Sequence, residues 1–252
     1  MRAVALVALI AAGCGDNSDG WRPIFDGHSL SGWSPWLAVS GRDHDPSGIF
    51  RVEDGMIHVL GVDLAAGQFE FGYLSTVDDF ANVRIRFSYQ WGPRRFVSWG
   101  PDSGFFVGVS GVDQVWPKSL ECQVAGGDTG SAYVFANATA STTIDPAIAA
   151  PQYLDAGTPY VTPRVPDLSR VAHEAAVDSL TDWNDVEITI DRDEVEFAVN
   201  GTTTFRATGL RQPSAVTPDD PTADVALTGK LAIQNEGNEI WYRDLEVQPI
   251  YH

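Results

Sequence analysis

The sequence predicts an all-β protein built as a sandwich of two antiparallel sheets. Short runs of alternating apolar and polar residues recur along the 252 residues. Turn-forming residues are abundant, with 24 glycines and 15 prolines, and no helical periodicity extends beyond two turns. Many short strands separated by turns are typical of a sandwich or jelly roll, in which two sheets share one core.

The expected strands begin with a hairpin. Residues 49–53 and 56–60 flank Asp54-Gly55, a dipeptide typical of two-residue hairpin turns. A second hairpin is expected between residues 186–190 and 195–199. The other predicted strands are residues 83–89, 105–109, 119–124, 202–206, 230–234 and 240–247.

One long stretch, residues 126–182, lacks this pattern. It contains five prolines and has weak periodicity, whereas residues 21–252 otherwise show no domain linker. Long segments of this kind in compact domains are usually functional or disordered. We therefore expect a single domain over residues 21–252 with an insertion at about 126–182 that packs over one face or rim, with a short helix within residues 169–180.

The N-terminus has the pattern of a signal peptide. Arg2 precedes a short apolar run that ends in Ala11-Ala12-Gly13-Cys14, which resembles a bacterial lipobox. We expect residues 1–13 to be removed, Cys14 to be acylated, and residues 14–20 to form a tether. The expected location is the bacterial cell envelope, lipid-anchored and facing the periplasm or the outer surface. A plain secretory peptide cut nearby is the alternative.

Charge excludes several classes of partner. The chain carries 34 acidic and 16 basic side chains, a net charge of −18. Nucleic acids and anionic lipid surfaces require a basic face, so neither is expected as a partner. The sequence also has no phosphate loop, no dinucleotide fingerprint and no Gly-x-Ser-x-Gly motif.

Metal and thiol chemistry have little support in the sequence. The five histidines have no metal-ligand spacing, so no cofactor is expected, with calcium bound by carboxylates as the alternative. Cys122 lies in an alternating run, which favours a buried, inert thiol over a nucleophile.

Five sequence blocks occur in an order typical of one family. They are IFDGHSLSGW (residues 24–33), DSGFF (102–106), WPKSLECQ (116–123), DWNDVEI with VNG (182–188 and 199–201), and GKLAIQNEGNEIWYRDL (229–245). Together they resemble the 3-keto-disaccharide hydrolase family, long called domain of unknown function 1080. The resemblance implies a concanavalin A-like β-sandwich. The sequence departs from the family pattern at Asp102, Gly108 and Asn235-Glu236, so the resemblance does not specify the substrate in detail.

The resemblance also implies a reaction. Its substrates are glycosides whose C3 hydroxyl has been oxidised to a ketone, and carbohydrate is the expected partner. The ketone acidifies the C2 proton, so that a base can remove it and the C1 substituent can leave by elimination. Water then adds to give a 3-keto sugar, and the enzyme acts as a hydrolase or a lyase. Such a site needs a base, an acid and a positive group near the enolate.

Glu121 is the first candidate for the base, and Glu236 is the second candidate. Strand alternation places Glu121 and Gln123 on the face opposite Leu120 and Cys122, hence away from the core. A solvated strand carboxylate and an ordinary turn residue are the respective structural alternatives for Glu121 and Glu236.

Other residues could bind the substrate. Lys118 is expected to hold the enolate or the leaving oxygen, and Trp116 to stack on a sugar ring, with Trp99 and Trp91 as alternatives. Further substrate contacts are expected from Gln123, Asp102, Asn235 and Arg243. An exposed cation, a core aromatic side chain and a structural arginine are the alternatives for Lys118, Trp116 and Arg243.

A module without activity remains the rival hypothesis. Sandwiches host both lectins and enzymes, so the same fold could bind glycan or the cell wall without catalysis. An enzyme requires Glu121, Glu236 and Lys118 to converge, whereas a binding module requires only an aromatic-lined groove. The oligomeric state is left open by the sequence.

Overall fold

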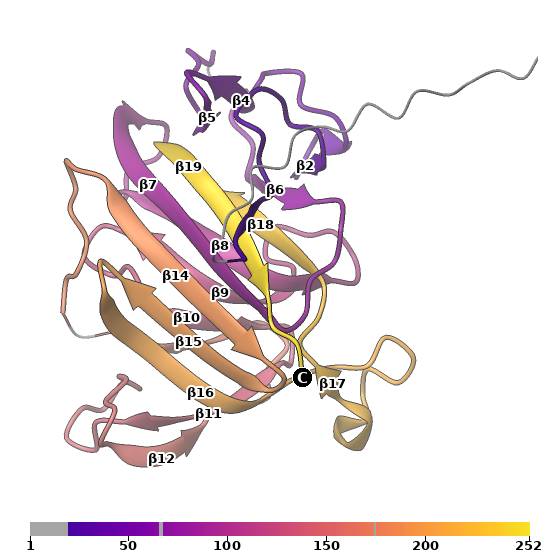
Figure 1. The fold of residues 1–252 in the computed structure, drawn as a ribbon, viewed down its shortest axis with the longest axis vertical. Helices are drawn as coiled ribbons and strands as arrows, with labels where there is room; N and C mark the ends of the chain where they lie inside the picture. The colour runs from indigo at the N-terminus through magenta and orange to yellow at the C-terminus, as the bar shows by residue number, and fades with distance from the viewer. Residues whose placement is uncertain (1–19, 66–67, 174) are drawn as a thin grey trace, which may run out of the picture.

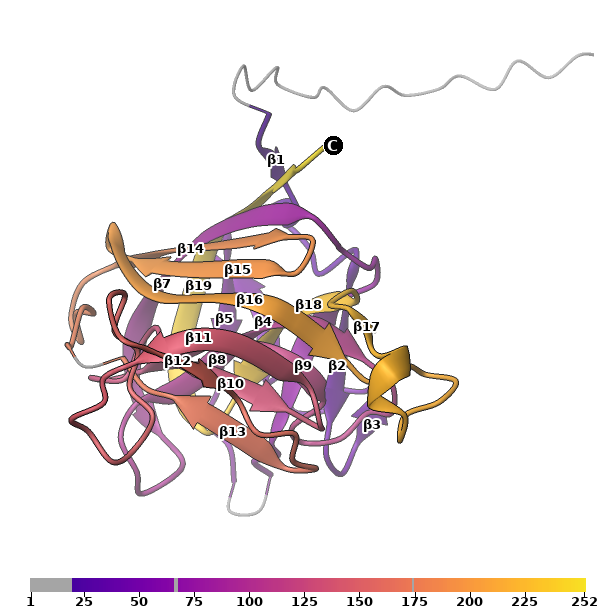
Figure 2. The ribbon, with the colours of Figure 1, turned by 90° about the horizontal axis from the view of Figure 1, so that it is seen from below.

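Two antiparallel sheets, packed face to face, make up the molecule (Figures 1 and 2). The computed structural model describes residues 20–65, 68–173 and 175–252. The described residues contain one short 3-10 helix, η1 (Pro221–Ala223), and are otherwise strands and loops. The predicted all-β sandwich is therefore confirmed.

The larger sheet has eleven strands. Nine follow one another in the order β12 (Thr158–Val161), β11 (Thr139–Ile144), β16 (Thr202–Gln212), β15 (Glu194–Val199), β14 (Asn184–Asp191), β7 (Val83–Arg95), β19 (Asn238–Pro249), β5 (Met56–Val59) and β4 (Phe50–Glu53). The short strand β1 (Arg22–Pro23) pairs with β19, and β17 (Val225–Ala226) pairs with β16.

The smaller sheet has eight strands. Their order is β13 (Leu168–Val171), β10 (Ala132–Phe135), β9 (Lys118–Ala125), β8 (Asp102–Ser110), β18 (Lys230–Asn235), β6 (Gly72–Thr76), β2 (Trp33–Leu37) and β3 (Gly41–Arg42). The consecutive strands β9 and β8 thus lie at the centre of this sheet beside β18, which comes from a distant part of the chain.

The core lies between the two sheets. Phe87 of the larger sheet stacks on Phe105 of the smaller one, with ring centroids 4.5 Å apart. Leu120 and Cys122 on β9 belong to the same apolar cluster and are fully buried. The Cys122 thiol is free, and burial raises its pKa, so it packs in the core as a small apolar side chain.

Local chemistry explains the hairpins. Asp54 and Gly55 both adopt positive φ, 51° and 79°, as a two-residue hairpin turn between β4 and β5 requires. The 186–199 hairpin forms as β14 and β15. Several strands extend beyond the predicted runs, because β7 and β16 continue through residues without clean alternation.

The stretch 126–182 differs from the expectation. It does not lie over a face; it supplies β10 and β13 to one sheet and β11 and β12 to the other, extending both at one edge (Figure 2). Residues 168–171 form strand β13, and the described residues from there to 180 contain no helix. The physical reason is pairing with a distant strand, since β13 is held by β10.

The predicted signal peptide and Cys14 lie outside the described residues. Within the described residues, no helix has the length and apolar character needed to cross a membrane.

Candidate functional site

The outer face of the smaller sheet carries a row of polar side chains. On β9, Cys122 points into the core, so Glu121 and Gln123 point outward, as the alternation predicts. The register sets Glu121 beside Phe106 and Gln123 beside Gly104. Phe106 belongs to a second apolar cluster, on this outer face.

Glu121 is buried although it faces away from the core. The residue is only 3% exposed to solvent. Its Oε1 atom has no hydrogen-bond partner among the described residues. The carboxyl lies over Gly104, where an added Cβ would be 1.7 Å from Oε1. The absence of a side chain at Gly104 therefore makes room for the acid.

Burial changes the chemistry of Glu121. It is the main reason that the pKa of this carboxyl lies well above its ordinary value, and negative charge on Glu236 and Asp102 raises that pKa further. The group therefore holds its proton more tightly than an exposed glutamate does.

Glu236 and Asp102 form a coupled pair next to Glu121. Burial raises the pKa of Glu236 to about 9, and the charge of Asp102 and a hydrogen bond with it add to the effect. Burial also raises the pKa of Asp102, whose Oδ1 accepts a hydrogen bond from Gln123 Nε2 at 3.1 Å. At neutral pH Glu236 keeps its proton and donates a hydrogen bond to the Asp102 carboxylate.

The edge strands add a cation. Tyr133 on β10 pairs with Glu121 on one side and with Arg170 of β13 on the other. The Arg170 guanidinium lies 5.7 Å from the centroid of the Tyr133 ring and forms an ion pair with Asp128. Asp128 also accepts a hydrogen bond from Ser131 Oγ at 2.6 Å.

Sequence reasoning missed this group. Asp128, Tyr133 and Arg170 belong to the Pro-rich stretch that had no family motif. The only available signal was the short alternation in residues 132–135 and 168–171, which is too brief to be distinctive.

Aromatic rings lie on the same face. Phe71, which directly precedes β6, stacks on Trp99 at 6.3 Å and meets Trp116 edge-on at 6.2 Å. Trp116 also packs against the outer-face cluster that contains Tyr73 and Phe106. Trp99 is 47% exposed, so it offers the more accessible ring.

Three predicted site residues lie elsewhere. Lys118 is on the same side of β9 as Leu120, the side opposite Glu121. Its Nζ donates a hydrogen bond to Pro213 O at 3.0 Å. Asn235 is buried, and both ends of its amide are used in structural hydrogen bonds. Its Oδ1 accepts from Gly237 N within the turn, and its Nδ2 donates to Glu70 O. Arg243 stacks over Trp183 on the larger sheet, 3.9 Å from the ring centroid. The convergence expected of Lys118 with Glu121 and Glu236 is therefore not found.

Burial also lowers the pKa of Lys118.

In the described part of the chain, no three histidine, cysteine, aspartate or glutamate side chains are arranged to hold a metal ion. The site thus combines Glu121 as a buried base with Glu236 as a proton donor. The guanidinium of Arg170 lies two strands away from Glu121.

Comparison with known proteins adds a family. The model of the 3-keto-alpha-glucoside-1,2-lyase-like domain matches residues 20–248. No curated protein matches the chain.

Solved structures support the fold. Two candidate glycosyl hydrolases from Parabacteroides distasonis ATCC 8503 are similar, at 18% and 16% identity. The first has a TM-score of 0.57 over 93% of this chain and 95% of that one, and the second 0.55 over 91% and 99%. A β-glucanase from Bacillus licheniformis is 10% identical, with a TM-score of 0.52 over 92% and 97% of the two chains. At such identities the likeness establishes the sandwich alone.

Proposed function

The chain belongs to the family of 3-keto-alpha-glucoside-1,2-lyase-like domains, and from this membership we propose that it cleaves 3-keto-glycosides by eliminating the C1 substituent. The observation that carries the proposal is the group formed by Glu121, which is buried, and by Glu236 and Asp102, which are half-buried, on one sheet face. Groups whose pKa is perturbed by burial and by one another are typical of acid–base sites.

The reaction balances without an oxidant. A base removes the C2 proton, and the electron pair moves onto the C3 carbonyl oxygen as an enolate. The enolate collapses to a C1–C2 double bond while the C1–O bond breaks, and the leaving oxygen takes a proton. Water then adds across the double bond and gives the free 3-keto sugar.

Glu121 is assigned as the base and Glu236 as the acid. The raised pKa of Glu121 makes its ionised form a stronger base toward a carbon-bound proton. With a pKa of about 9, Glu236 keeps its proton at neutral pH and can give it to the leaving oxygen. Gln123 donates a hydrogen bond to Asp102, which in turn accepts the hydrogen bond of Glu236 and so holds that carboxyl in place.

Arg170 takes the role first expected of Lys118. Its strand is two strands from that of Glu121 on the same face, a separation of about 10 Å that a sugar ring above Tyr133 would fill. The guanidinium would then face the C3 oxygen as negative charge develops there.

A keto-glucoside with a chromogenic leaving group tests the proposal. We expect release from this substrate and none from the unoxidised glucoside, with and without a chelator. Glu121→Gln and Glu236→Gln should each lower kcat/KM by about 100-fold or more. Arg170→Met and Lys118→Met each remove one cation and so form a matched pair. Arg170→Met should lower kcat/KM by about 10-fold or more, whereas Lys118→Met should lower it by less than about 3-fold. Equal losses in the two cation variants would contradict the role of Arg170.

One observation favours the rival function. Glu121 is only 3% exposed, whereas Trp99 presents an open ring, as a non-catalytic carbohydrate-binding or envelope module would. No release from either substrate by the folded protein, combined with saccharide binding that Trp99→Ala abolishes, would favour the binding module.

A further inference from the structure

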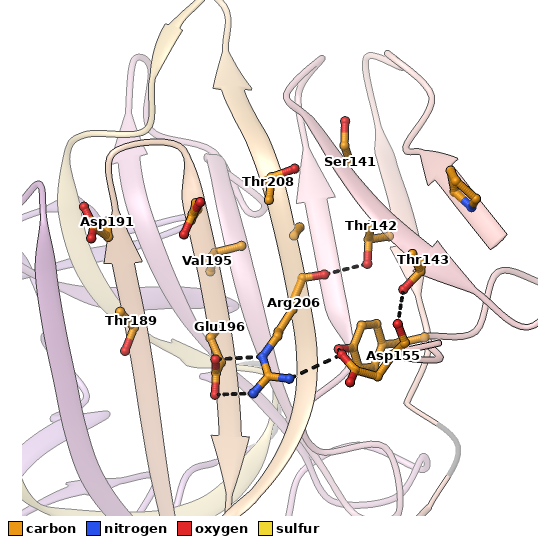
Figure 3. A pocket seen from close by; sticks show the side chains of 14 residues that line it. Ser141, Thr142, Thr143, Asp155, Thr189, Asp191, Val195, Glu196, Arg206 and Thr208 are labelled. Carbon is orange, nitrogen blue, oxygen red and sulfur yellow. Dashed lines mark hydrogen bonds and ion pairs between the residues drawn. The ribbon is translucent and has the colours of Figure 1, made fainter. Parts of the chain in front are cut away.

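The larger sheet has a hollow on its own outer face (Figure 3). Glu121 lies on the other sheet. The volume of the hollow is about 610 Å³, within the range of about 300–1,000 Å³ typical of small-molecule sites. Strands β14, β15 and β16 form its floor, and the β11–β12 hairpin with residues 153–155 forms its wall. We call this the Arg206 hollow.

Arg206 lies at its centre and is held on two sides. Its Nε donates to Glu196 Oε2 at 2.8 Å and its Nη2 to Oε1 at 3.3 Å. Its Nη1 donates to Asp155 Oδ1 at 3.3 Å, and the Tyr153 hydroxyl donates to the same oxygen at 2.9 Å (Figure 3). Contacts with Arg206 hold the pKa of Glu196 and, together with Tyr153, that of Asp155 below their usual values. Both carboxylates therefore stay ionised at neutral pH.

The rest of the lining offers hydroxyls and apolar surface. The side-chain hydroxyls of Ser141, Thr189 and Thr208 make no hydrogen bond to other described residues, so they are available to a ligand. Pro159 and the Tyr153 ring, which packs against Phe205, add apolar area.

Charge narrows the class of ligand. Four carboxylates and one guanidinium line the hollow, which disfavours phosphates, sulfates and uronic acids. Glu196 and Asp155 already pair with Arg206, and Asp191 pairs with His252. Glu194 is therefore the one lining carboxylate without an ion pair among the described residues. This pairing favours a neutral ligand with many hydroxyl groups and one apolar face over a cation.

We propose that the Arg206 hollow binds a neutral saccharide, as a second site on the sheet opposite the carboxylates. Planar carboxylates and the guanidinium would bond to paired hydroxyls, and Tyr153 with Pro159 would contact the C–H face of the ring. The inference stands apart from the proposed catalysis, because no residue of the Arg206 hollow belongs to that site.

Ligand-observed NMR titration of the full chain tests the proposal. The probes are maltose, cellobiose and trehalose, with spermidine and inorganic phosphate as charged alternatives. Thr208→Trp fills the hollow from an exposed strand position without removing an ion pair. Thr202→Trp is the matched control, an exposed position on the same strand β16 that lies outside the hollow.

We expect at least one neutral saccharide to bind with a Kd of about 1 mM or tighter. Thr208→Trp should weaken that binding about 10-fold or more, while Thr202→Trp and Glu121→Gln leave it within about 2-fold. Binding of spermidine or phosphate alone, no saccharide binding up to about 20 mM, or an equal loss in both tryptophan variants would overturn the proposal. Loss in Glu121→Gln would overturn it too, because the saccharide would then occupy the other face.

Discussion

At the scale of single residues, the proton on Glu236 links the candidate site to stability. The folded protein keeps this proton up to about pH 9, whereas an unfolded glutamate loses it near its ordinary pKa of 4.5. Between these values unfolding releases a proton, so the stability that Glu236 contributes is greatest at low pH and falls as pH rises, by up to about 1.4 kcal/mol per pH unit.

Glu236→Gln should therefore flatten this dependence. A glutamine cannot ionise, so the variant should lose less stability than the wild type between about pH 5 and about pH 8. Urea unfolding at several pH values measures the slope, with Glu194→Gln, an exposed position, as the control. If the two variants show the same slope, Glu236 is not a buried protonated acid.

The alternation of side chains along a strand explains for which residues the sequence could predict the face of the sheet. The period of two correctly turned Glu121 away from the core, because Leu120 and Cys122 are both buried in it. The same rule puts Lys118 on the core side of the strand, yet its place in a family block favoured a site role. A motif records that residues are adjacent in sequence, and adjacent strand residues face opposite ways.

At the scale of elements, one end of the larger sheet is tied by a buried histidine. His58 of β5 lies between two carboxylates, with Nδ1 2.6 Å from Glu53 and Nε2 2.8 Å from Glu239. Its ring stacks on Trp241, and Arg94 of β7 also pairs with Glu239 at 2.7 Å. His58 thus joins β4, β5 and β19 directly, and Glu239 extends the network to β7.

His58→Gln should destabilise this end of the sheet. It removes charge-assisted bonds and leaves the buried Glu239 with Arg94 alone, at a cost of roughly 2–3 kcal/mol. Denaturant unfolding measures the change, and His28→Gln, an exposed histidine, should stay within about 0.5 kcal/mol of the wild type. If His58→Gln changes the free energy of unfolding no more than the control does, His58 does not stabilise this end of the sheet.

Elements differed in how far sequence could predict them. Strands closed by local turn chemistry, such as those around Asp54-Gly55, were predictable, because the signal lies within about ten residues. Strands β10 to β13 were not, since β13 is placed by pairing with β10 and β11 by pairing with the distant β16. Pro159 in β12 is tolerated because that strand is at the sheet edge.

At the scale of the whole molecule, the candidate site is assembled by sheet order. Asp102, Glu121 and Glu236 come from three separate segments, which meet only because β9, β8 and β18 are neighbours. Family blocks could nominate these residues, but the proximity of the carboxyls and the cation at Arg170 required the topology.

The proposed anchor belongs to this scale as well. The chain enters the domain at β1, which pairs with β19 at Val247 and Glu246 of the larger sheet, so a tether from Cys14 would attach on the sheet opposite Glu121. Seven residues span at most about 25 Å, which would hold the domain near the membrane with the carboxylate face turned away from it.

Cys14→Ser in the full chain tests the anchor, with Cys122→Ser as the matched removal of a thiol. Acylation contributes about 0.8 kcal/mol per buried methylene, so the wild type should fractionate with membranes, require detergent for release and incorporate labelled palmitate. Cys14→Ser should lose all three properties, whereas Cys122→Ser should keep them, because the Cys122 thiol is buried in the core. Release of the wild type without detergent, and without label, would instead support cleavage of a plain secretory peptide.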